Sequence, residues 1–346
     1  MSRSRPTSRD VAALAGVSVA TVSYVVNGRD ARRVGPETRE RVLAAARELG
    51  YAPNTSARGL RRRRTERIAL VVGAIGVPAN DQLARDLHAA ADEYGYGVIT
   101  MVVDSRARAD KAFELLRQHI ADGAVVAAPE SYLDPDALAA LTRGGLPLVV
   151  LDNRLAEEHA DPVEARPFDV VRTPEKSACT DAFDHLIRSG RRRIAYIGHR
   201  HDFAPGARSG RYAAYLAAHD RHGLERDRRL AVSGADDRVT GYRAAADLLR
   251  LPEPPDAIFA SSDRAAISAI WAARDAELSV PRDVAVVGVG NLEEGLVTRP
   301  TLSTVGQTLL DYSGVAELLF DRIFAKEPPP GRELTLPWSF IRREST

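Results

Sequence analysis

Short apolar runs alternate with helical patterns from residue 68 onward, and this alternation restricts the possible folds more than any other feature. The runs predict strands at 68–72, 97–103, 123–127, 147–151, 194–198, 257–260 and 284–288, with a last strand or return segment near 303–305. Helical patterns fall at 82–94, 107–120, 178–188, 211–222, 240–250, 263–275 and 308–325. Strands that are apolar on both faces and alternate with helices form parallel sheets covered by helices. The strands are too many for one small sheet, so we expect two α/β subdomains.

The N-terminal part of the chain has a different pattern, which predicts three short helices. Thr7 and Asp10 have the spacing of a capping box at the start of the first helix. Gly16 suits the end of that helix, Ser18 suits the start of the second, and Gly35-Pro36 opens the third. Two short helices joined by a tight turn with glycine match a helix-turn-helix. From this pattern alone, an ordinary helical hairpin stays an alternative.

Charge is distributed unevenly along the chain. The net charge is +1, but residues 1–67 hold 15 Arg against 6 Asp and Glu, a balance of +9. The remaining residues have a balance of −8. A basic arm on an acidic body indicates a polyanionic partner for the arm only.

Several classes of protein are disfavoured by composition. The single cysteine, Cys179, excludes a disulfide within the chain and argues against a cysteine-based metal site. Nothing approaches an apolar run of about 18 residues, and no apolar segment follows the basic start MSRSRPTSRD. We therefore expect a cytoplasmic protein without a membrane span or a secretory signal. A loop with His199, His201 and Asp202 could contact a ligand or a metal, but such clusters are more often solvent-exposed, so we expect no metal and no cofactor.

The second helix is the expected DNA-reading element, because in a helix-turn-helix this helix enters the major groove. The residues expected to pack inward are Val22, Val25 and Val26. The residues left to face DNA or to cap the helix are Val19, Ala20, Thr21, Ser23 and Tyr24. These side chains are uncharged, which fits base reading by methyl and hydroxyl groups while flanking arginines hold phosphates.

The segment DVAALAGVSVATVSYVVNG resembles the first two helices of the lactose/purine-repressor (LacI/GalR) family. TRERVLAAARELGYAPN resembles the third helix, and SARGLRRRRTERIAL resembles the hinge helix that leads into the first strand. HLIRSGRRRIAYIG, PDAIFASSDRAA, RPTLSTV and RREST are similar to further landmarks, so the resemblance covers essentially the whole chain. It implies an all-α helix-turn-helix domain at 1–53, a hinge at 54–67, and an effector-binding and dimerisation domain at 68–346. That α/β body would be periplasmic-binding-protein-like, with two subdomains, parallel sheets and crossovers near 152–172 and 290–308.

The resemblance also implies roles for individual residues on DNA. The positions that read the major groove are Val19, Ala20 and Tyr24. Positions that hold the backbone or support the helices are Thr7, Ser18, Thr21, Ser23 and Asn27. The minor-groove face of the hinge maps to Ser56, Ala57 and Leu60, with Leu60 as a wedge between base pairs. Because Gly59 disfavours helix and Arg61–Arg64 repel one another, we expect the hinge to fold only on DNA.

A second set of residues maps to the effector site between the subdomains: Gly73, Val77, Asp152, Arg211, Ser262, Asp263, Gly290, Asn291, Gln307 and Leu309. The sequence departs from the family pattern here. Ser262 stands where the family has Asn, Gly290 where it has an acidic residue, and Pro174-Glu175 where it has Asp-Asn. The His of the usual Gly-His-Arg-Arg is Arg191. A plain monosaccharide effector is therefore in doubt, and the site is expected to take a less hydroxylated ligand, a larger one, or none. Arg211 and Asp152 have the alternative of a surface or interlobe ion pair.

The function expected from these features is a DNA-binding transcriptional regulator, most simply a repressor. It would act as a homodimer on a palindromic operator under the control of a small molecule, sugar or nucleoside-like. An activator or a corepressed regulator stays an alternative, and so, at lower weight, does a solute-binding protein. An enzyme is disfavoured because the sequence has no Gly-rich phosphate loop, no Gly-x-Ser-x-Gly elbow and no HExxH.

Overall fold

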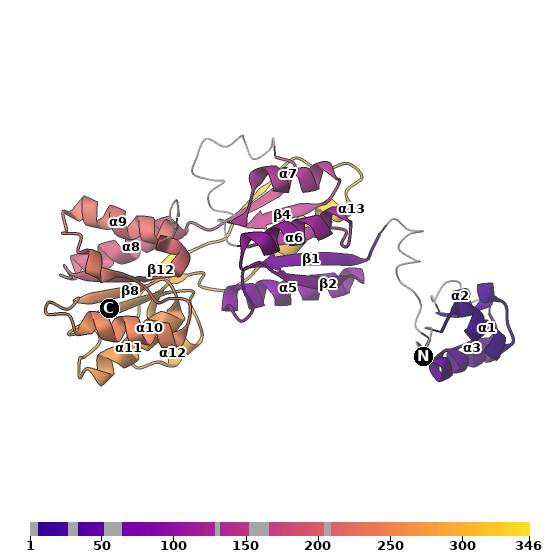
Figure 1. Cartoon of the computed structure of the whole chain (residues 1–346), viewed down its shortest axis with the longest axis horizontal. Coiled ribbons are helices and arrows are strands. Elements are labelled where there is room, and N and C mark those ends of the chain that lie inside the picture. The colour runs from indigo at the N-terminus through magenta and orange to yellow at the C-terminus, as the bar shows by residue number, and fades with distance from the viewer. Residues whose placement is uncertain (1–5, 27–33, 52–63, 129–131, 152–165, 204–208) are drawn as a thin grey trace. The chain divides into compact units, whose positions relative to one another are not determined.

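A computed structural model describes residues 6–26, 34–51, 64–128, 132–151, 166–203 and 209–346 (Figure 1). Contacts between residues divide the chain into two compact units, Met1–Thr65 and Glu66–Thr346. Within the described ranges, no single helix is long and apolar enough to span a membrane, and one bent pair of helices, α1 with α2, passes that test by length and composition.

The N-terminal unit contains three helices, α1 (Ser8–Ala15), α2 (Val19–Val26) and α3 (Pro36–Leu49). Helices α1 and α2 are bent by 103° relative to each other, within the range of a helix-turn-helix. Their small core consists of Val11, Ala12, Ala15, Val22, Val25, Val42, Ala45 and Ala46.

Local interactions explain the boundaries of α1 and α2. The backbone N–H of Thr7 donates to the Asp10 carboxylate at 2.7 Å, which satisfies a group at the start of α1. Gly16 ends α1 with φ +63°, a left-handed conformation that glycine adopts without steric cost. The Ser18 hydroxyl accepts the N–H of Thr21 at 3.1 Å and so caps α2. The predicted capping box and turn therefore form.

The first lobe of the larger unit is built on a parallel six-stranded sheet in the order β11-β5-β4-β3-β1-β2. Its strands are β1 (Arg67–Val72), β2 (Gly97–Val102), β3 (Ala124–Ala127), β4 (Leu148–Leu151), β5 (Asp169–Arg172) and β11 (Glu333–Thr335). Its helices are α5 (Pro78–Tyr94), α6 (Arg106–Arg117), α7 (Pro135–Arg143) and α13 (Ser313–Phe324). Figure 1 shows these helices on the two faces of the sheet.

Alternate residues of β1 explain why its sequence is apolar throughout. Ile68 and Leu70 belong to the core that packs against α5 and α13. Ala69 and Val71 belong to the core that packs against α6 and α7 on the other face. Both faces are covered, so neither set of side chains can be polar.

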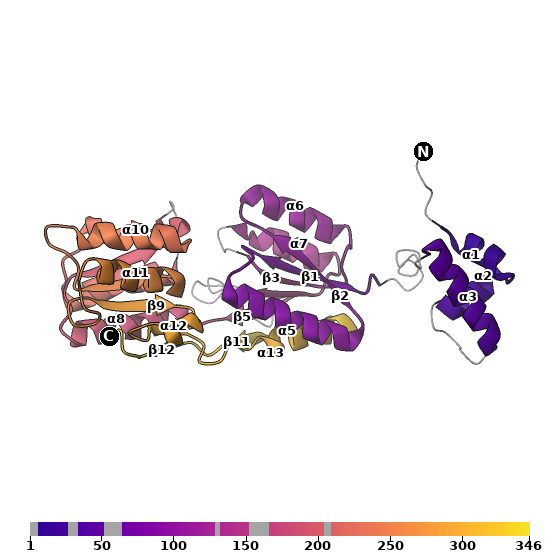
Figure 2. The ribbon, with the colours of Figure 1, turned by 90° about the horizontal axis from the view of Figure 1, so that it is seen from below.

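The second lobe repeats this plan with a six-stranded sheet in the order β12-β10-β9-β8-β6-β7 (Figure 2). Its strands are β6 (Ile194–Gly198), β7 (Ala231–Ser233), β8 (Ala257–Ala260), β9 (Ala285–Val289), β10 (Ser303–Gly306) and β12 (Ser339–Ile341). Its helices are α8 (Glu175–Arg188), α9 (Gly210–His222), α10 (Arg238–Leu249), α11 (Asp263–Asp275) and α12 (Glu294–Val297), with short 3-10 turns at Arg200–Phe203 and Arg228–Leu230. Helices α8 and α9 cover one face, and α10 and α11 cover the other. Strand β12 is antiparallel to β10, and the other pairings are parallel.

The chain passes between the lobes at 173–174, 307–312 and 336–338. The first passage follows the expected range 152–172 directly, because β5 still pairs within the first lobe. The second begins at the end of the expected range 290–308, since β10 is part of the second-lobe sheet. The third passage was not expected, because the three-residue strands β11 and β12 on either side of it carry no recognisable apolar run.

A buried ion triad fastens this returning segment to the first lobe. The fully buried Asp169 of β5 accepts Arg322 of α13 at 2.6 Å and Arg332, just before β11, at 2.9 Å. Burial raises the pKa of Asp169, but the hydrogen bonds from both arginines outweigh it and hold the pKa below its usual value. The carboxylate thus stays charged and joins three elements.

Candidate functional site

Helix α2 presents the predicted base-reading residues on its outer face. Val19 is 44% exposed and Tyr24 is 40% exposed, although both are large apolar or aromatic side chains. Ala20 between them is exposed as well. Val22 and Val25 on the opposite face are buried in the unit's core. The outer surface of α2 is therefore uncharged, which suits a helix that reads bases through methyl and hydroxyl groups.

The residues predicted to support the DNA-reading helix lie mainly at the starts of α1 and α2. Ser18 caps α2, and its hydroxyl also lies 2.9 Å from that of Thr21. Thr7 and Asp10 form the start of α1, where the backbone hydrogen bond from Thr7 lowers the pKa of Asp10. Ser23 is half-buried on α2. The predicted Asn27, Ser56, Ala57, Leu60 and, in the body, Asp152 lie outside the described residues.

The other predicted effector residues lie at the carboxyl ends of strands or on the passage between the lobes. Gly73 follows β1, Val77 precedes α5, and Gly290 and Asn291 follow β9. Gln307 and Leu309 lie on the passage 307–312, and Ser262 with Asp263 begins α11 directly after β8. Ligands of open α/β sheets bind at such carboxyl ends.

Arg211, on the first turn of α9, is engaged with its own lobe. Its Nε and Nη2 atoms donate to one carboxylate oxygen of Glu175, at the start of α8, at 2.8 Å and 2.5 Å. Its Nη1 atom donates to the carbonyl of Ser261, and the guanidinium lies 5.9 Å from the ring centroid of Trp338. Arg211 thus forms a mostly buried ion pair within the second lobe, which differs from the surface or interlobe pair that the sequence offered as its alternative.

Asp263 is almost fully buried, with only 1% of its surface exposed. One carboxylate oxygen accepts the hydroxyl of Thr304 and the other accepts the N–H of Leu292, both at 2.6 Å. A Cβ atom at Gly288 would lie 2.2 Å from this carboxylate, so the strand must carry glycine there. Asp263 therefore joins α11 to β9 and β10 from inside the second lobe.

Asn291 connects the second lobe to the passage 307–312. Its side-chain amide donates to the carbonyls of Gln307 at 2.7 Å and Thr308 at 3.3 Å. Its amide oxygen accepts Arg343, from the C-terminal segment, at 2.6 Å. Asn291 has φ +52°, a left-handed conformation that asparagine tolerates better than most residues.

A contact that sequence reasoning missed joins the two lobes directly. Arg264, the residue after Asp263, donates through Nη2 to the carbonyl of Gly76 in the loop between β1 and α5. The N–H of Gly76 donates to Asp81 at 3.1 Å, which fixes that loop to the start of α5. The sequence feature that marks this contact is Arg264 itself, the last residue of the ASSDR segment.

The histidine loop after β6 forms a compact polar group. The rings of His199 and His201 are stacked, with centroids 5.1 Å apart and an interplanar angle of 7°. His199 pairs with Asp236 at 3.0 Å, and the hydrogen bond from His199 lowers the pKa of Asp236 to about 2. Within the described part of the chain, no three His, Cys, Asp or Glu residues are arranged to hold a metal ion.

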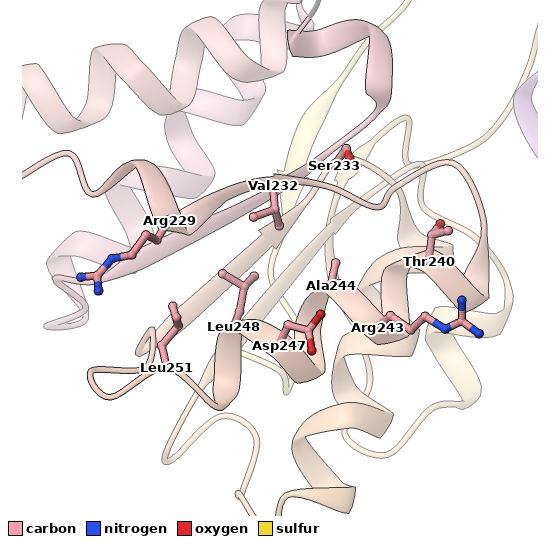
Figure 3. A pocket seen from close by; sticks show the side chains of 9 residues that line it. All are labelled: Arg229, Val232, Ser233, Thr240, Arg243, Ala244, Asp247, Leu248 and Leu251. Atoms are coloured by element: carbon pink, nitrogen blue, oxygen red, sulfur yellow. The ribbon is translucent and has the colours of Figure 1, made fainter.

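A groove of about 350 Å³ lies on the second lobe beside the edge strand β7 and helix α10 (Figure 3). Its apolar floor is formed by Val232, Ala244, Leu248 and Leu251, and Figure 3 shows Arg229 and Arg243 at opposite ends. The remaining lining residues are Ser233, Thr240 and Asp247. This groove involves none of the predicted effector residues.

Comparison with known protein families matches both parts of the chain. A model of bacterial regulatory proteins of the lacI family matches residues 7–54, and a model of the periplasmic binding protein-like domain matches residues 183–346. The transcriptional regulator CelR of Thermobifida fusca is 33% identical over 99% of both chains. Catabolite control protein A of Staphylococcus xylosus is 30% identical over 97% of this chain and 98% of the relative.

Solved structures are similar over the whole chain. The complex of the transcriptional regulator CelR with cellobiose superposes with a TM-score of 0.65 at 30% identity and covers 99% of this chain and 100% of that one. The Lac repressor dimer bound to operator and the anti-inducer ONPF gives a TM-score of 0.73 over 99% of both chains. Its identity is 24%, so that likeness concerns the fold.

A helix-turn-helix unit followed by a two-lobed body with parallel-dominated sheets defines a class of DNA-binding transcriptional regulators. The predicted fold class is therefore confirmed. Within that class, the family match and the relatives at 30% identity and above establish that the chain belongs to the LacI family of bacterial transcriptional regulators.

Proposed function

We propose that this regulator is a repressor that binds a palindromic operator as a homodimer and is controlled by a small molecule between its lobes. The observation that carries the proposal is the outer face of α2, where Val19, Ala20 and Tyr24 are exposed on a helix whose other face is fully packed. Exposed apolar side chains at that place suit contacts with thymine methyl groups and base edges. As a DNA-binding protein, it would act in the cytoplasm.

For the remaining DNA contacts, we propose that the basic N-terminal arm holds phosphates and the hinge enters the minor groove. Thr7, Ser18, Thr21, Ser23 and Asn27 would position the helices. The hinge residues Ser56, Ala57 and Leu60 would widen and bend the site centre, with Leu60 inserted between base pairs. The charge balance of +9 in residues 1–67 supports strong phosphate attraction.

For the effector site, we propose the region that joins the lobes. It would include Gly73, Val77, Asp152, Arg211, Ser262, Asp263, Gly290, Asn291, Gln307 and Leu309. The CelR structure with cellobiose and the LacI-family regulator from Enterococcus faecium with bound ribose support a small-molecule ligand. The Arg264–Gly76 contact between the lobes supports coupling, because a ligand that changes lobe spacing must change this contact.

For the homodimer, we propose a face on the second lobe that carries exposed apolar side chains. Trp271 lies on α11, and Leu296 and Val297 on α12 are 51% and 71% exposed. Exposed apolar side chains that form a patch mark protein–protein interfaces more often than free surface. The solved Lac repressor is a dimer, which supports a dimeric state without identifying the face. A two-fold dimer would match the symmetry of a palindromic operator.

The alternative function is a regulator that activates transcription, or a repressor that binds DNA only with its effector bound. A specific observation favours a non-sugar or degenerate effector site: Asp263, Asn291 and Arg211 are all bonded within the protein. Relatives named as a transcriptional regulator (CelR) and a transcriptional repressor (PurR) support a role without catalysis.

The proposal is tested by a mobility-shift titration of pooled genomic fragments at low salt, with wild-type protein and Tyr24→Ala. We expect wild-type to retain a small set of fragments and Tyr24→Ala to lose or change that set. Val239→Ala, a change at an exposed apolar residue on α10 outside the proposed DNA, effector and dimer surfaces, is the control for general effects on DNA binding. The proposal fails if wild-type retains no fragment, or if the Tyr24 variant retains the same fragments with equal affinity.

A further inference from the structure

The groove of about 350 Å³ on the second lobe lies between strand β7 and helix α10 (Figure 3). Three of the apolar side chains on its floor, Val232, Ala244 and Leu251, are only partly buried against the core of this face. Apolar surface in such a hollow is in contact with water, and covering it with other apolar side chains is favourable. The groove is therefore shaped to receive apolar side chains from outside the lobe.

Strand β7 also offers main-chain hydrogen bonds along this groove. It is at the edge of its sheet, so one side of its main chain has no neighbouring strand among the described residues. In its register with β6, the N–H of Gly234 donates to the carbonyl of Gly198. Because bonding directions alternate along a strand, the N–H and carbonyl of Ser233 face away from β6. Outward groups of an edge strand are a template for pairing with another strand.

Charge differs between the two ends of the groove. Arg229, at the end where β7 begins, donates to the Asp227 carboxylate at distances between 2.7 and 3.1 Å, so its charge is matched. Arg243, at the opposite end, has no hydrogen-bond or ion-pair partner within the described part of the chain. Asp247, between them, pairs with Arg250 at 3.3 Å. An acidic group of an occupant would therefore find its partner at the Arg243 end.

The groove shares no lining residue with the surfaces proposed for DNA, the effector or the dimer. Strand β7 forms one edge of the second-lobe sheet, whereas β12 and β10 lie at the opposite edge. Helix α12, which belongs to the proposed dimer face, directly precedes β10 in the chain. A strand added beside β7 lengthens the sheet at the edge away from β10, so we expect it to leave the dimer face open.

We propose that this groove is a docking site for an extended peptide segment of a partner protein, which adds a strand to β7. The segment carries apolar side chains at alternate positions, facing Val232 and Leu251, and a carboxylate at the end that meets Arg243. An extended chain fits because its main chain bonds the outward groups of Ser233 while every second side chain points into the groove. Since β7 has only three residues, few main-chain bonds form, and the interaction is transient.

The test is a selection of a displayed random heptapeptide library on immobilised full-length protein, followed by anisotropy titration of the enriched peptide made synthetically. We expect the enriched sequences to share alternate apolar residues and an acidic residue. Ser233→Pro removes the outward N–H, which proline can do on an edge strand, and should weaken binding at least about tenfold. Ser233→Ala keeps this N–H and should stay within about twofold of wild-type.

Two further measurements separate main-chain pairing from charge. A peptide that is N-methylated one position at a time tests the same main-chain bonds on the unmodified protein, and it should lose binding only at alternate positions. Arg243→Glu should weaken binding about threefold or more. Arg188→Glu, at an exposed arginine on α8 across the sheet, is its matched control and should bind like wild-type. Circular dichroism and DNA binding should be unchanged in each variant.

The inference is overturned if no peptide is enriched over a blank surface, or if the enriched peptide binds Ser233→Pro and its N-methylated forms as tightly as the unmodified pair. Equal weakening by Arg243→Glu and Arg188→Glu would also overturn it. Binding that depends on Arg243 but not on main-chain N–H groups would assign the groove to a helix or a small molecule instead. Association of wild-type beyond a dimer that Ser233→Pro abolishes would assign the edge to a second copy, which likewise contradicts the proposal.

Discussion

At the scale of single residues, Asp263 has the most unusual environment among the described candidates. Burial raises its pKa to about 6 from the ordinary 3.8, although the hydrogen bonds from Thr304 and Leu292 oppose the shift. The carboxyl was expected from the sequence to face a ligand. In the folded protein it instead organises the ends of β9 and β10, because the absence of a side chain at Gly288 leaves room for it.

This shift predicts a pH dependence of stability. Between about pH 4 and about pH 6, the folded protein holds a proton on Asp263 that the unfolded chain has released. The contribution of this group to the free energy of unfolding therefore falls as pH rises through that window. Urea unfolding of wild-type and Asp263→Asn at several pH values should show this decline in wild-type only. Parallel curves for the two proteins would contradict the assignment.

The Arg211–Glu175 pair gives a second prediction at this scale. Both side chains are mostly buried, so removing one leaves the other without its partner. In a double-mutant cycle with Arg211→Met and Glu175→Gln, we expect a coupling of about 1–3 kcal/mol in the free energy of unfolding. The exposed pair Arg250–Asp247 serves as the comparison and should couple by less than about 0.5 kcal/mol. Equal coupling in the two pairs would mean that Arg211 is free to serve a ligand.

At the scale of elements, α2 depends on Ser18, the residue that caps its start. Ser18→Ala removes the hydroxyl that accepts the N–H of Thr21, and helix caps of this kind contribute about 1 kcal/mol. We expect amide exchange in α2 to become faster, while Ser18→Asp, which keeps an acceptor, stays close to wild-type. Exchange in β1 of the body provides the internal reference. Unchanged protection of α2 in Ser18→Ala would show that the cap contributes nothing.

The individual strands and helices also show how much of the fold the sequence could predict. Long apolar runs such as β1 and β9 were predicted within about two residues, because burial on both faces requires continuous apolar sequence. Strands β7, β11 and β12 have only three residues each and are partly exposed, so no pattern marks them. Helix α13 begins at Ser313 rather than 308, because the passage 307–312 precedes it.

The candidate site was predictable in position but not in its bonding. Carboxyl ends of strands follow from the order of elements, so the region around Asp263 and Asn291 could be located. Which partner each side chain takes depends on residues distant in sequence: Arg343 reaches Asn291, and Arg264 reaches Gly76. The exposure of Val19 and Tyr24 was predictable, since helical spacing places Val22 and Val25 on the packed face.

At the scale of the whole molecule, the division of charge predicts how DNA binding responds to salt. An arm with a balance of +9 on a body with −8 should neutralise phosphates with the arm alone. For about 6–10 phosphate contacts, affinity should fall by about 10³–10⁵-fold between about 50 and 200 mM salt. Anisotropy titrations over that range measure the slope. A slope near zero would exclude the arginine arm as the source of affinity.

The central claim is that the exposed residues of α2 choose the DNA sequence while the arginines supply affinity. The most direct measurement is selection from a random duplex library with wild-type and a variant in which Val19, Ala20 and Tyr24 are all exchanged. The account predicts a two-fold symmetric consensus for wild-type and a different symmetric consensus for the variant, with similar salt dependence. Recovery of the same consensus by both proteins, or of no consensus by wild-type, would contradict it.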